Sequence, residues 1–287
     1  MTKKNPKQAQ TLKIPRIIVI TAKFLEVIST KLVTRFAAKL FTTPIKYKIP
    51  KREFLMDKNS KQQKLFIPKI NKEIMVYQYG TSNRKILLVH GWSGRGTQLY
   101  KIADELLNIG FATISFDAPA HGKSKGNTTI MVEFIECILE IEKKYGYFEF
   151  AIGHSLGGMS VLNAIKHKLN IEKAVIIGSG DSIQDITDDF IKNLQLKPNI
   201  SNELTHYFEN KYQLKMNDFS SSVIAKKVKI PVLIIHDEND EEVNVKSAHA
   251  ISKVLNQSKL IITKGLGHRK ILGNNKVIQN IVQFITE

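Results

Sequence analysis

The stretch FAIGHSLGGMS, residues 150–160, places one serine between two glycines directly after an apolar run. Gly153, Ser155 and Gly157 form the pattern G-x-S-x-G, and an apolar helical pattern follows. Between a strand and a helix, this pattern predicts a sharp, strained turn that lifts the serine hydroxyl clear of the sheet, above a helix N-terminus. Glycines are expected there because a Cβ would strike the neighbouring strand or helix. Ordinary glycine-rich turns can show the same five-residue pattern. Whether the serine is a nucleophile therefore depends on which other residues could act with it.

Apolar strands alternate with helical patterns on both sides of this turn. Near-continuous runs of Val, Ile and Leu suit strands buried on both faces, and their alternation with helices indicates a parallel sheet. Upstream, KLFIP (64–68) and EIMVYQYG (73–80) show a period of two and predict an antiparallel hairpin. The sequence therefore predicts an α/β fold, with a mostly parallel twisted sheet of about eight strands and helices on both faces. The six further strands are KILLVHG, FATISFD, FEFAIGH, KAVIIGSG, KIPVLIIHD and SKLIIT.

The chain of 287 residues is long enough for one substantial core, and we expect one main domain over residues 51–287. One insertion separates two of its strands. Residues 181–228 contain two helical patterns split by Pro198, and they predict a small helical cap. Because the cap can roof a crevice, we expect it to set specificity, with Phe190, Tyr207 and Phe208 either lining the pocket or packing within the cap.

The net charge of +17 is concentrated at the N-terminus, where residues 1–50 hold eleven Lys or Arg and a single Glu. No zinc-finger, helix-turn-helix or RNA-binding signature accompanies it, so we expect no nucleic-acid partner. Apolar residues between Ile14 and Leu40 recur at helical spacing, which predicts a basic amphipathic helix in this extension. Its charges interrupt the segment too often for a bilayer span. Three surfaces could receive the apolar face of this helix: the globular domain, a second subunit or an anionic membrane. Docking on protein is favoured.

The remaining composition bears on compartment and cofactors. Cys137 is the only cysteine, so no intramolecular disulfide can form, and its apolar helical surroundings predict a buried, inert thiol. The start of the chain lacks an uninterrupted apolar run followed by a small-residue cleavage site. We therefore expect a cytoplasmic protein, membrane-associated if the N-terminal helix binds lipid. No His, Cys and Asp cluster has zinc-like spacing and no nucleotide-binding glycine motif occurs, so no metal or cofactor is expected.

A serine hydroxyl is a poor nucleophile at neutral pH, so it needs a base and the base needs an orienting carboxylate. Asp237, Glu238 and Asp240 follow the strand KIPVLIIH, and His268 follows the strand SKLIIT. In an open parallel sheet, both loops reach the crevice beyond the carboxyl ends of the strands. The order serine, acid, histidine is the one expected for α/β-hydrolases.

The chain from about residue 73 to the C-terminus resembles the α/β-hydrolase superfamily, in particular its serine esterases and lipases. The resemblance implies that Ser155 is the nucleophile, that His268 is the general base and then the acid, and that Asp240 orients His268. Asp237 and Glu238 remain alternatives to Asp240, although the spacing H-x-x-x-D-x-x-V favours Asp240 in this family. The matching segments, in family order, are HGWSG (90–94), FDAPAHGKS (116–124), GHSLGG (153–158), HDENDEEV (236–243) and GLGH (265–268).

The resemblance also implies an oxyanion hole formed by the backbone N–H groups of Trp92 and Leu156. The Trp92 ring either lines the acyl pocket or only packs. We expect four further polar residues of these segments to brace loops rather than to transfer protons; they are His90, Asp117, His121 and His154. Arg95 and Arg269 would favour an anionic substrate, but an exposed arginine is the commoner outcome.

The activity that these features predict is cleavage of a carboxylic ester or thioester in a small-molecule acyl substrate, through an acyl-enzyme intermediate. The serine at the turn excludes the dehalogenase and epoxide branches of the superfamily, which use aspartate there. Two alternatives remain open. One is a non-catalytic ligand-binding protein on the same scaffold, and the other is an acyltransferase or amidase of the same superfamily.

Overall fold

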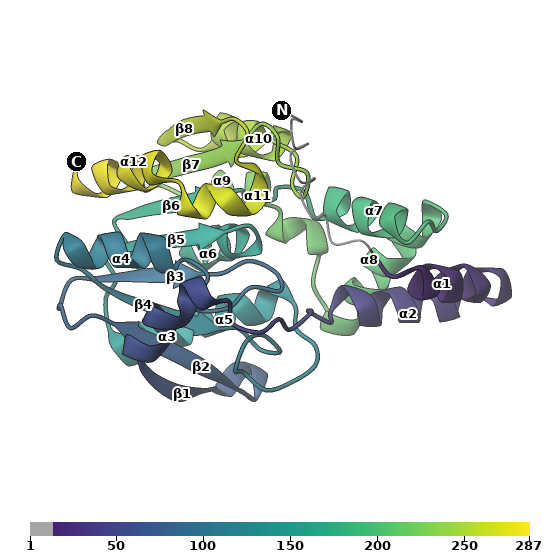
Figure 1. The fold of residues 1–287 in the computed structure, drawn as a ribbon. Helices are drawn as coiled ribbons and strands as arrows, with labels where there is room; N and C mark the ends of the chain where they lie inside the picture. Colours follow the sequence, from purple (N-terminus) through teal and green to yellow (C-terminus); the bar gives the residue numbers. More distant parts are fainter. Residues whose placement is uncertain (1–13) are drawn as a thin grey trace, which may run out of the picture.

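The computed structural model describes residues 14–287, so the first thirteen residues of the predicted basic extension lie outside the described part. An eight-stranded sheet forms the centre of the molecule, in the order β1-β2-β4-β3-β5-β6-β7-β8 (Figure 1). β1 pairs antiparallel with β2, as predicted, β2 pairs antiparallel with β4, and the other neighbours are parallel. The predicted fold class is confirmed. The strands are β1 (Lys61–Ile67), β2 (Lys72–Tyr79), β3 (Lys85–Val89), β4 (Ala112–Asp117), β5 (Phe150–His154), β6 (Lys173–Ile177), β7 (Val232–Asp237) and β8 (Ser258–Thr263).

Each face of the sheet has its own apolar core, because side chains alternate along every strand. In β3, Leu87 and Val89 join one core, and Ile86 and Leu88 join the other. Helices α5, α6, α9 and α10 cover the first face, and α3, α4 and α12 cover the second. We call this sheet with its covering helices the α/β body. Its helices are α3 (Phe54–Asn59), α4 (Tyr100–Asn108), α5 (Met131–Tyr145), α6 (Leu156–Lys166), α9 (Ser221–Ala225), α10 (Lys246–Val254), α11 (Gly267–Lys270) and α12 (Asn275–Thr286).

The N-terminal segment forms two helices, α1 (Arg16–Ile28) and α2 (Thr30–Phe41), where the periodicity predicts one. The break falls at Ser29, whose backbone is extended. Valine and isoleucine propagate a helix poorly, and Val27 and Ile28 precede the break. Ser29 thus ends α1 and stands at the N-cap position of α2, where its side chain makes no capping hydrogen bond.

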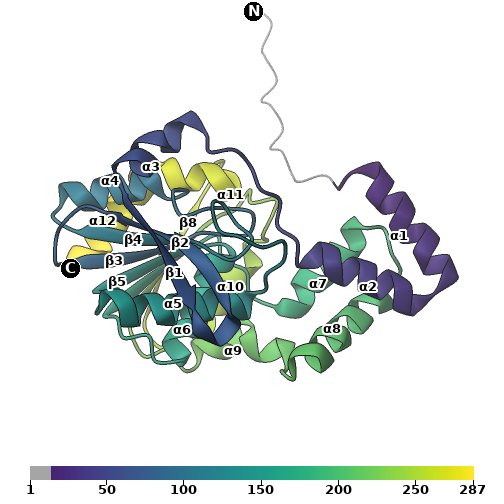
Figure 2. The same ribbon diagram turned by 90° about the horizontal axis from the view of Figure 1, so that it is seen from below.

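The two N-terminal helices pack on α7 (Ile183–Asn193) and α8 (Asn199–Tyr212), the two helices of the predicted cap. Figures 1 and 2 show these four helices as a group beside the sheet, which we call the helical lobe. Small residues of α1 and α2 allow close approach to larger residues of α8 and the α7–α8 loop. This third apolar core contains Ala22, Val33, Ala37, Ala38, Ile191, Leu194, Leu196, Ile200, Leu204 and Phe208.

Cys137 lies buried in α5, as its apolar surroundings predict. Burial raises the pKa of its thiol well above the ordinary value, which keeps it protonated and unreactive. No helix among residues 14–287 combines the length and the apolar character that crossing a bilayer requires.

Candidate active site

Ser155 lies at the corner between β5 and α6, with a backbone φ of 54° and ψ of −121°. L-amino acids rarely adopt a positive φ, and such strain persists only where surrounding contacts impose it. A Cβ on Gly153 would lie 2.5 Å from the carbonyl oxygen of Gly157, and one on Gly157 would lie 2.3 Å from that of Val89. The strained turn and the steric need for these two glycines follow the sequence prediction.

His268 and Asp240 form a close pair at the ends of two neighbouring loops. His268 Nδ1 lies 2.7 Å from Asp240 Oδ2, and the other carboxylate oxygen accepts the N–H groups of Glu242 and Val243 at 2.9 Å each. Burial by itself raises the pKa of Asp240, but hydrogen bonds from His236 and His268 outweigh it and hold that pKa well below the ordinary value. The carboxylate is therefore ionised, and it orients His268 with its proton on Nδ1.

The two alternative carboxylates of this loop have other partners. Asp237 accepts hydrogen bonds from the Thr263 hydroxyl at 2.7 Å and the Leu266 N–H at 3.0 Å, and so holds the loop that carries His268. Glu238 forms an ion pair with Lys264 at 2.6 Å on the surface. Asp240 is the one of the three carboxylates that is hydrogen-bonded to His268.

Sequence reasoning missed His236, the last-but-one residue of β7. Its fully buried Nε2 lies 3.4 Å from Asp240 Oδ2 and 2.9 Å from the Val243 carbonyl oxygen. The side chain thereby fixes both the carboxylate and the turn that follows it. The signal was present in the H-x-x-x-D spacing, because a turn of that length folds the carboxylate back over the histidine.

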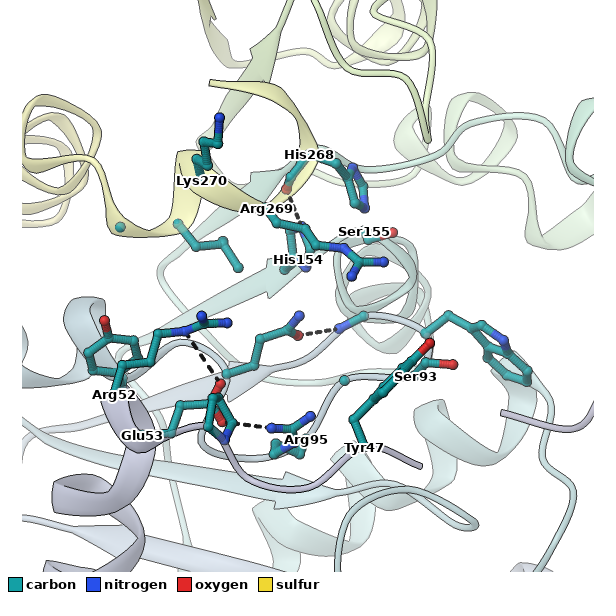
Figure 3. Close-up of a pocket in the computed structure, with 18 of the residues that line it drawn as sticks. Tyr47, Arg52, Glu53, Ser93, Arg95, His154, Ser155, His268, Arg269 and Lys270 are labelled. Atoms are coloured by element: carbon teal, nitrogen blue, oxygen red, sulfur yellow. Dashed lines mark hydrogen bonds and ion pairs between the residues drawn. The ribbon is translucent and has the colours of Figure 1, made fainter. Parts of the chain in front are cut away.

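A cavity of about 950 Å³ brings Ser155 and His268 together in one wall (Figure 3). The imidazole of His268 lies against that of His154, with ring centroids 4.6 Å apart, and His154 immediately precedes Ser155. The hydrogen bonds of residues 14–287 do not include one between Ser155 Oγ and His268. Contacts of this kind are often long in ligand-free hydrolases and tighten when substrate binds.

Two backbone N–H groups next to Ser155 are unused. Within residues 14–287, neither the N–H of Trp92 nor that of Leu156 donates a hydrogen bond to another protein group. Leu156 is the first residue of α6, where N–H groups have no intrahelical acceptor and the helix dipole favours negative charge. Trp92 lines the cavity, and its ring also packs edge-on against His121. Within the described residues, both N–H groups are therefore available to an acceptor outside the protein.

Three buried polar residues brace the loops around these donors, as predicted. His90 accepts the Ala118 N–H and His121 accepts the Ser93 N–H, each at 3.0 Å. Asp117 accepts two backbone N–H groups, at 2.7 Å and 2.6 Å. Burial lowers the pKa of His121 to about 4, so the ring is neutral near pH 7 and can act as an acceptor.

His154 braces the loop that carries His268 in the same way. Its Nε2 lies 2.9 Å from the backbone carbonyl oxygen of His268. Burial, followed by the nearby charge of His268, lowers the pKa of His154 to about 3. The neutral ring therefore donates to that carbonyl group and positions His268 without exchanging a proton with it.

Sequence models of two families match consecutive parts of the chain. The model described as alpha/beta hydrolase fold matches residues 85–215, and the one described as TAP-like protein matches residues 213–287. The chain belongs to the α/β-hydrolase superfamily. The resemblance carried by its five sequence segments is thereby confirmed. No curated protein sequence matches this α/β-hydrolase.

Solved structures share its fold at low sequence identity. An esterase from Exiguobacterium antarcticum has a TM-score of 0.61 and 18% identity, over 76% of this chain and 97% of that chain. A bromoperoxidase from Bacillus anthracis has the same TM-score and identity, over 79% and 99%. A membrane phospholipase A, described as a bacterial virulence factor, has a TM-score of 0.62 and 14% identity, over 94% and 93%. These identities establish the shared fold alone.

The cavity of this α/β-hydrolase is walled by the linker between α2 and α3, and no residue of the cap at 181–228 is among its lining residues. The expectation that the cap roofs the crevice is therefore wrong. The cap helices pack on α1 and α2, and Phe190, Tyr207 and Phe208 all belong to that contact. The linker is tied to the loop after β3, because the Ile45 N–H donates to Ser93 Oγ at 3.0 Å.

Arg95 is buried, in contrast to the exposed position that was the commoner expectation. Its guanidinium lies 3.3 Å from the buried carboxylate of Glu53, which also accepts the Thr97 hydroxyl at 2.7 Å. This ion pair joins the linker to the loop that carries Trp92. Arg269 is exposed, as expected, and pairs with Glu242 at 2.9 Å.

Proposed function

We propose that this α/β-hydrolase is a serine hydrolase that cleaves a carboxylic ester or thioester through an acyl-enzyme intermediate. One arrangement carries the proposal: a serine on a strained corner shares a cavity wall with a histidine that an ionised aspartate orients. The two unused N–H groups beside the serine add the place for a developing negative charge.

In the first half of the reaction, Ser155 Oγ attacks the acyl carbonyl carbon and transfers its proton to His268 Nε2. The carbonyl oxygen becomes an oxyanion that accepts hydrogen bonds from the N–H groups of Trp92 and Leu156. Asp240 stabilises the imidazolium that forms, because its carboxylate accepts a hydrogen bond from the Nδ1–H group. The intermediate then collapses, and the alcohol or thiol leaves with the proton from His268.

In the second half, water attacks the acyl-enzyme carbonyl carbon while His268 accepts a proton from it. A second oxyanion forms at the same two N–H groups and collapses to expel Ser155 Oγ, which regains its proton from His268. The carboxylic acid product leaves the cavity. The structural neighbours include an esterase and a phospholipase A, which supports esters as the first substrates to test.

Covalent labelling tests the nucleophile directly. Incubation with a fluorophosphonate is expected to add the mass of one phosphonyl group to Ser155, located by peptide mass spectrometry. The Ser155→Ala variant, which keeps the backbone corner, is expected to remain unlabelled. A folded wild-type protein that gains no mass would overturn the proposal and favour the non-catalytic ligand-binding alternative.

Substrate profiling then separates the remaining classes. Release of p-nitrophenol from esters of increasing acyl length measures acyl preference, and matched thioester and anilide substrates compare the leaving groups. The proposal predicts turnover of oxygen or sulfur esters above that of the anilide. Preferential anilide cleavage would instead assign the amidase alternative, and transfer of the acyl group to an added alcohol at the expense of hydrolysis would assign the acyltransferase.

A further inference from the structure

Exposed apolar side chains are concentrated in one part of the chain. Ten of the fourteen large apolar side chains that are exposed among residues 14–287 lie between Ile17 and Leu55. Scattered single exposures are normal on a soluble surface, but a cluster of this kind marks an interaction site. The ten are Ile17, Ile20, Phe24, Val27, Ile28, Leu32, Ile45, Tyr47, Phe54 and Leu55.

The first five of these residues form a ridge along α1. Their spacing of three and four residues places them on one face of the helix, opposite the buried Ala22. Val27 is 88% exposed and Phe24 is 65% exposed, so the helical lobe leaves this face uncovered. Leaving several large apolar side chains in water forfeits their burial energy, so the face is expected to bind an apolar partner.

Positive charge surrounds the apolar ridge. Arg16 and Lys23 are exposed on α1, and Lys31, Arg35 and Lys39 are exposed at four-residue spacing on α2. The single acidic residue of these two helices, Glu26, accepts the Lys197 N–H of the cap at 2.7 Å. The exposed faces of α1 and α2 therefore combine apolar and cationic groups, the combination that binds anionic lipid surfaces.

We propose that the ridge on α1 docks this protein on an anionic membrane surface, with its apolar side chains between the lipid headgroups. A second copy of the chain is a less favourable partner for this ridge. A two-fold contact would set the same surface of each copy against the other and would bring the five cations of α1 and α2 in one copy close to those in the other. In Figure 2, α1 lies at the right end of the molecule, and the linker runs from the helical lobe to α3 at the upper left. Tyr47 of that linker is exposed and also lines the Ser155 cavity, so the linker connects the helical lobe to the rim of the cavity.

Vesicle flotation of the full chain tests the docking surface. The protein is expected to float with vesicles of phosphatidylcholine and phosphatidylglycerol, to bind pure phosphatidylcholine vesicles weakly, and to dissociate from the anionic vesicles as salt rises. The variant Ile20→Ser/Phe24→Ser/Val27→Ser is expected to lose binding by tenfold or more, because it removes the apolar side chains that would be buried between the headgroups. Replacing exposed residues leaves the apolar cores intact, which circular dichroism checks.

Phe66→Ser is the matched control, because Phe66 on β1 is an exposed aromatic residue away from the ridge. It is expected to float as the wild type does. Equal flotation of the triple variant and the wild type would overturn the proposal. A wild-type dimer in sedimentation that the triple variant abolishes, without vesicle binding, would overturn it in favour of the second copy.

A different observation, the charge of the cavity, carries a second inference, which rests on the proposed hydrolase function. Six cationic side chains line the cavity against two carboxylates, an excess of four positive charges. Both carboxylates are paired, Glu53 with Arg95 and Glu242 with Arg269. Three of the other cations, Lys48, Lys101 and Lys270, have no carboxylate partner among the described residues. The six are Lys48, Arg52, Arg95, Lys101, Arg269 and Lys270.

We infer that the cavity binds esters that carry an anionic group, a phosphate or a carboxylate, away from the scissile carbonyl. A charge inside a partly enclosed cavity is screened less than one on an open surface, so these cations favour an anionic over a neutral ligand. Arg52 and Lys48 come from the linker that walls the cavity, and Lys270 comes from α11 near His268. Substrate selection is thus assigned to the linker and α11 rather than to the cap.

A matched pair of substrates tests this inference. A monoacylglycerol and its phosphate ester with the same acyl chain differ only by the anionic group, and fatty acid release is measured for both. A second pair, a neutral p-nitrophenyl ester and p-nitrophenyl hemisuccinate, tests a carboxylate in place of the phosphate. We expect kcat/KM to be higher by about tenfold for at least one anionic member.

The variant Lys48→Gln/Lys270→Gln is expected to lower that ratio, and Lys144→Gln, an exposed lysine of α5 outside the cavity, is expected to leave it unchanged. Hydrolysis of both members of each pair at equal kcat/KM would overturn the inference while leaving the hydrolase proposal intact. Absence of hydrolysis together with absence of fluorophosphonate labelling would overturn the hydrolase proposal itself.

Discussion

The α/β body and the helical lobe are held together by different kinds of contact. In the body, loops meet through buried polar groups with defined partners, such as Asp117 and His121. In the lobe, four amphipathic helices meet through small and apolar side chains, with alanines of α1 and α2 facing Leu204 and Phe208. Directional hydrogen bonds fix positions, whereas apolar contacts tolerate small shifts. The difference explains why the reactive groups lie in the body and none lies in the lobe.

The comparison also separates chemistry from placement. Ser155 and Leu156 lie at the corner between β5 and α6, while His154 braces the loop of His268 and His121 braces the loop of Trp92. The linker contributes cationic side chains to the wall of the cavity, and the lobe carries an exposed apolar surface. Substitutions at these groups of the body should therefore change the rate constant for the reaction, and substitutions in the lobe should change stability or location alone.

The largest effect that this comparison predicts is that of Ser155→Ala. Removing the nucleophile is expected to lower kcat by about 10⁶ while leaving the melting temperature near that of the wild type, because the backbone corner is unchanged. Stopped-flow or steady-state release of p-nitrophenol measures kcat. Ser252→Ala, a change at a surface serine, is the control. Turnover of Ser155→Ala within tenfold of the wild type would place the chemistry elsewhere.

The second effect distinguishes two carboxylates of one loop. Asp240→Asn is expected to lower kcat by about 10⁴, because an amide cannot hold His268 in the tautomer with its proton on Nδ1. Glu238→Gln, which only breaks a surface ion pair with Lys264, should leave kcat unchanged. The reverse order of the two effects, measured on the same ester, would assign the orienting role to Glu238.

The geometry of the reactive groups in the body could be predicted from the sequence to a large extent. Gly153 and Gly157 are required by contacts within one turn, and the H-x-x-x-D spacing placed Asp240 where His268 could reach it. These signals are local, because a strand, a tight turn and a helix follow one another along the chain. Their meeting in space follows from the order of parallel strands, which places all loop ends at one edge of the sheet.

The surroundings of the site could not be predicted, because they depend on contacts between distant segments. The linker shows no periodicity, and its place on the cavity follows from the pairing of Glu53 with Arg95 and of Ile45 with Ser93. The cap was assigned to the crevice because nothing in its own sequence reveals that α1 and α2 cover it. The role of His236 was missed since a histidine at the end of a buried strand is ordinarily a packed core residue.

A third prediction tests whether the lobe is separate from the chemistry. Leu204→Ala is expected to reduce the free energy of unfolding by about 2–5 kcal/mol, because Leu204 is fully buried in the lobe core. Under native conditions kcat should stay at the wild-type value, since no residue of α8 lines the cavity. Urea unfolding followed by circular dichroism measures the loss.

Leu162→Ala, an equally buried leucine of α6 in the body, is the matched substitution. We expect it to lower kcat as well as stability, because α6 carries Ser155 at its N-terminus. If Leu204→Ala lowered kcat as much as Leu162→Ala under conditions where both variants stay folded, the lobe would take part in positioning the reactive groups, and the distinction between the two regions would fail.

The smallest effect concerns pH and belongs to the body, where the buried histidines lie. Burial lowers the pKa of His121 from 6.5 to about 4 in the folded state, so between these values the unfolded chain binds a proton that the folded chain does not. The free energy of unfolding must then fall as pH is lowered through this window, by up to about 1.4 kcal/mol per pH unit for this group.

His121→Asn removes the ionisable ring, and the slope of unfolding free energy against pH between 4 and 6.5 should become shallower by up to one proton. Two other buried histidines with lowered pKa values, His90 and His154, keep their contributions in that variant, so a slope remains. An unchanged slope in His121→Asn would mean that the ring is protonated in the folded state, where it could no longer accept the Ser93 N–H, and the brace between the loops after β3 and β4 would need another explanation.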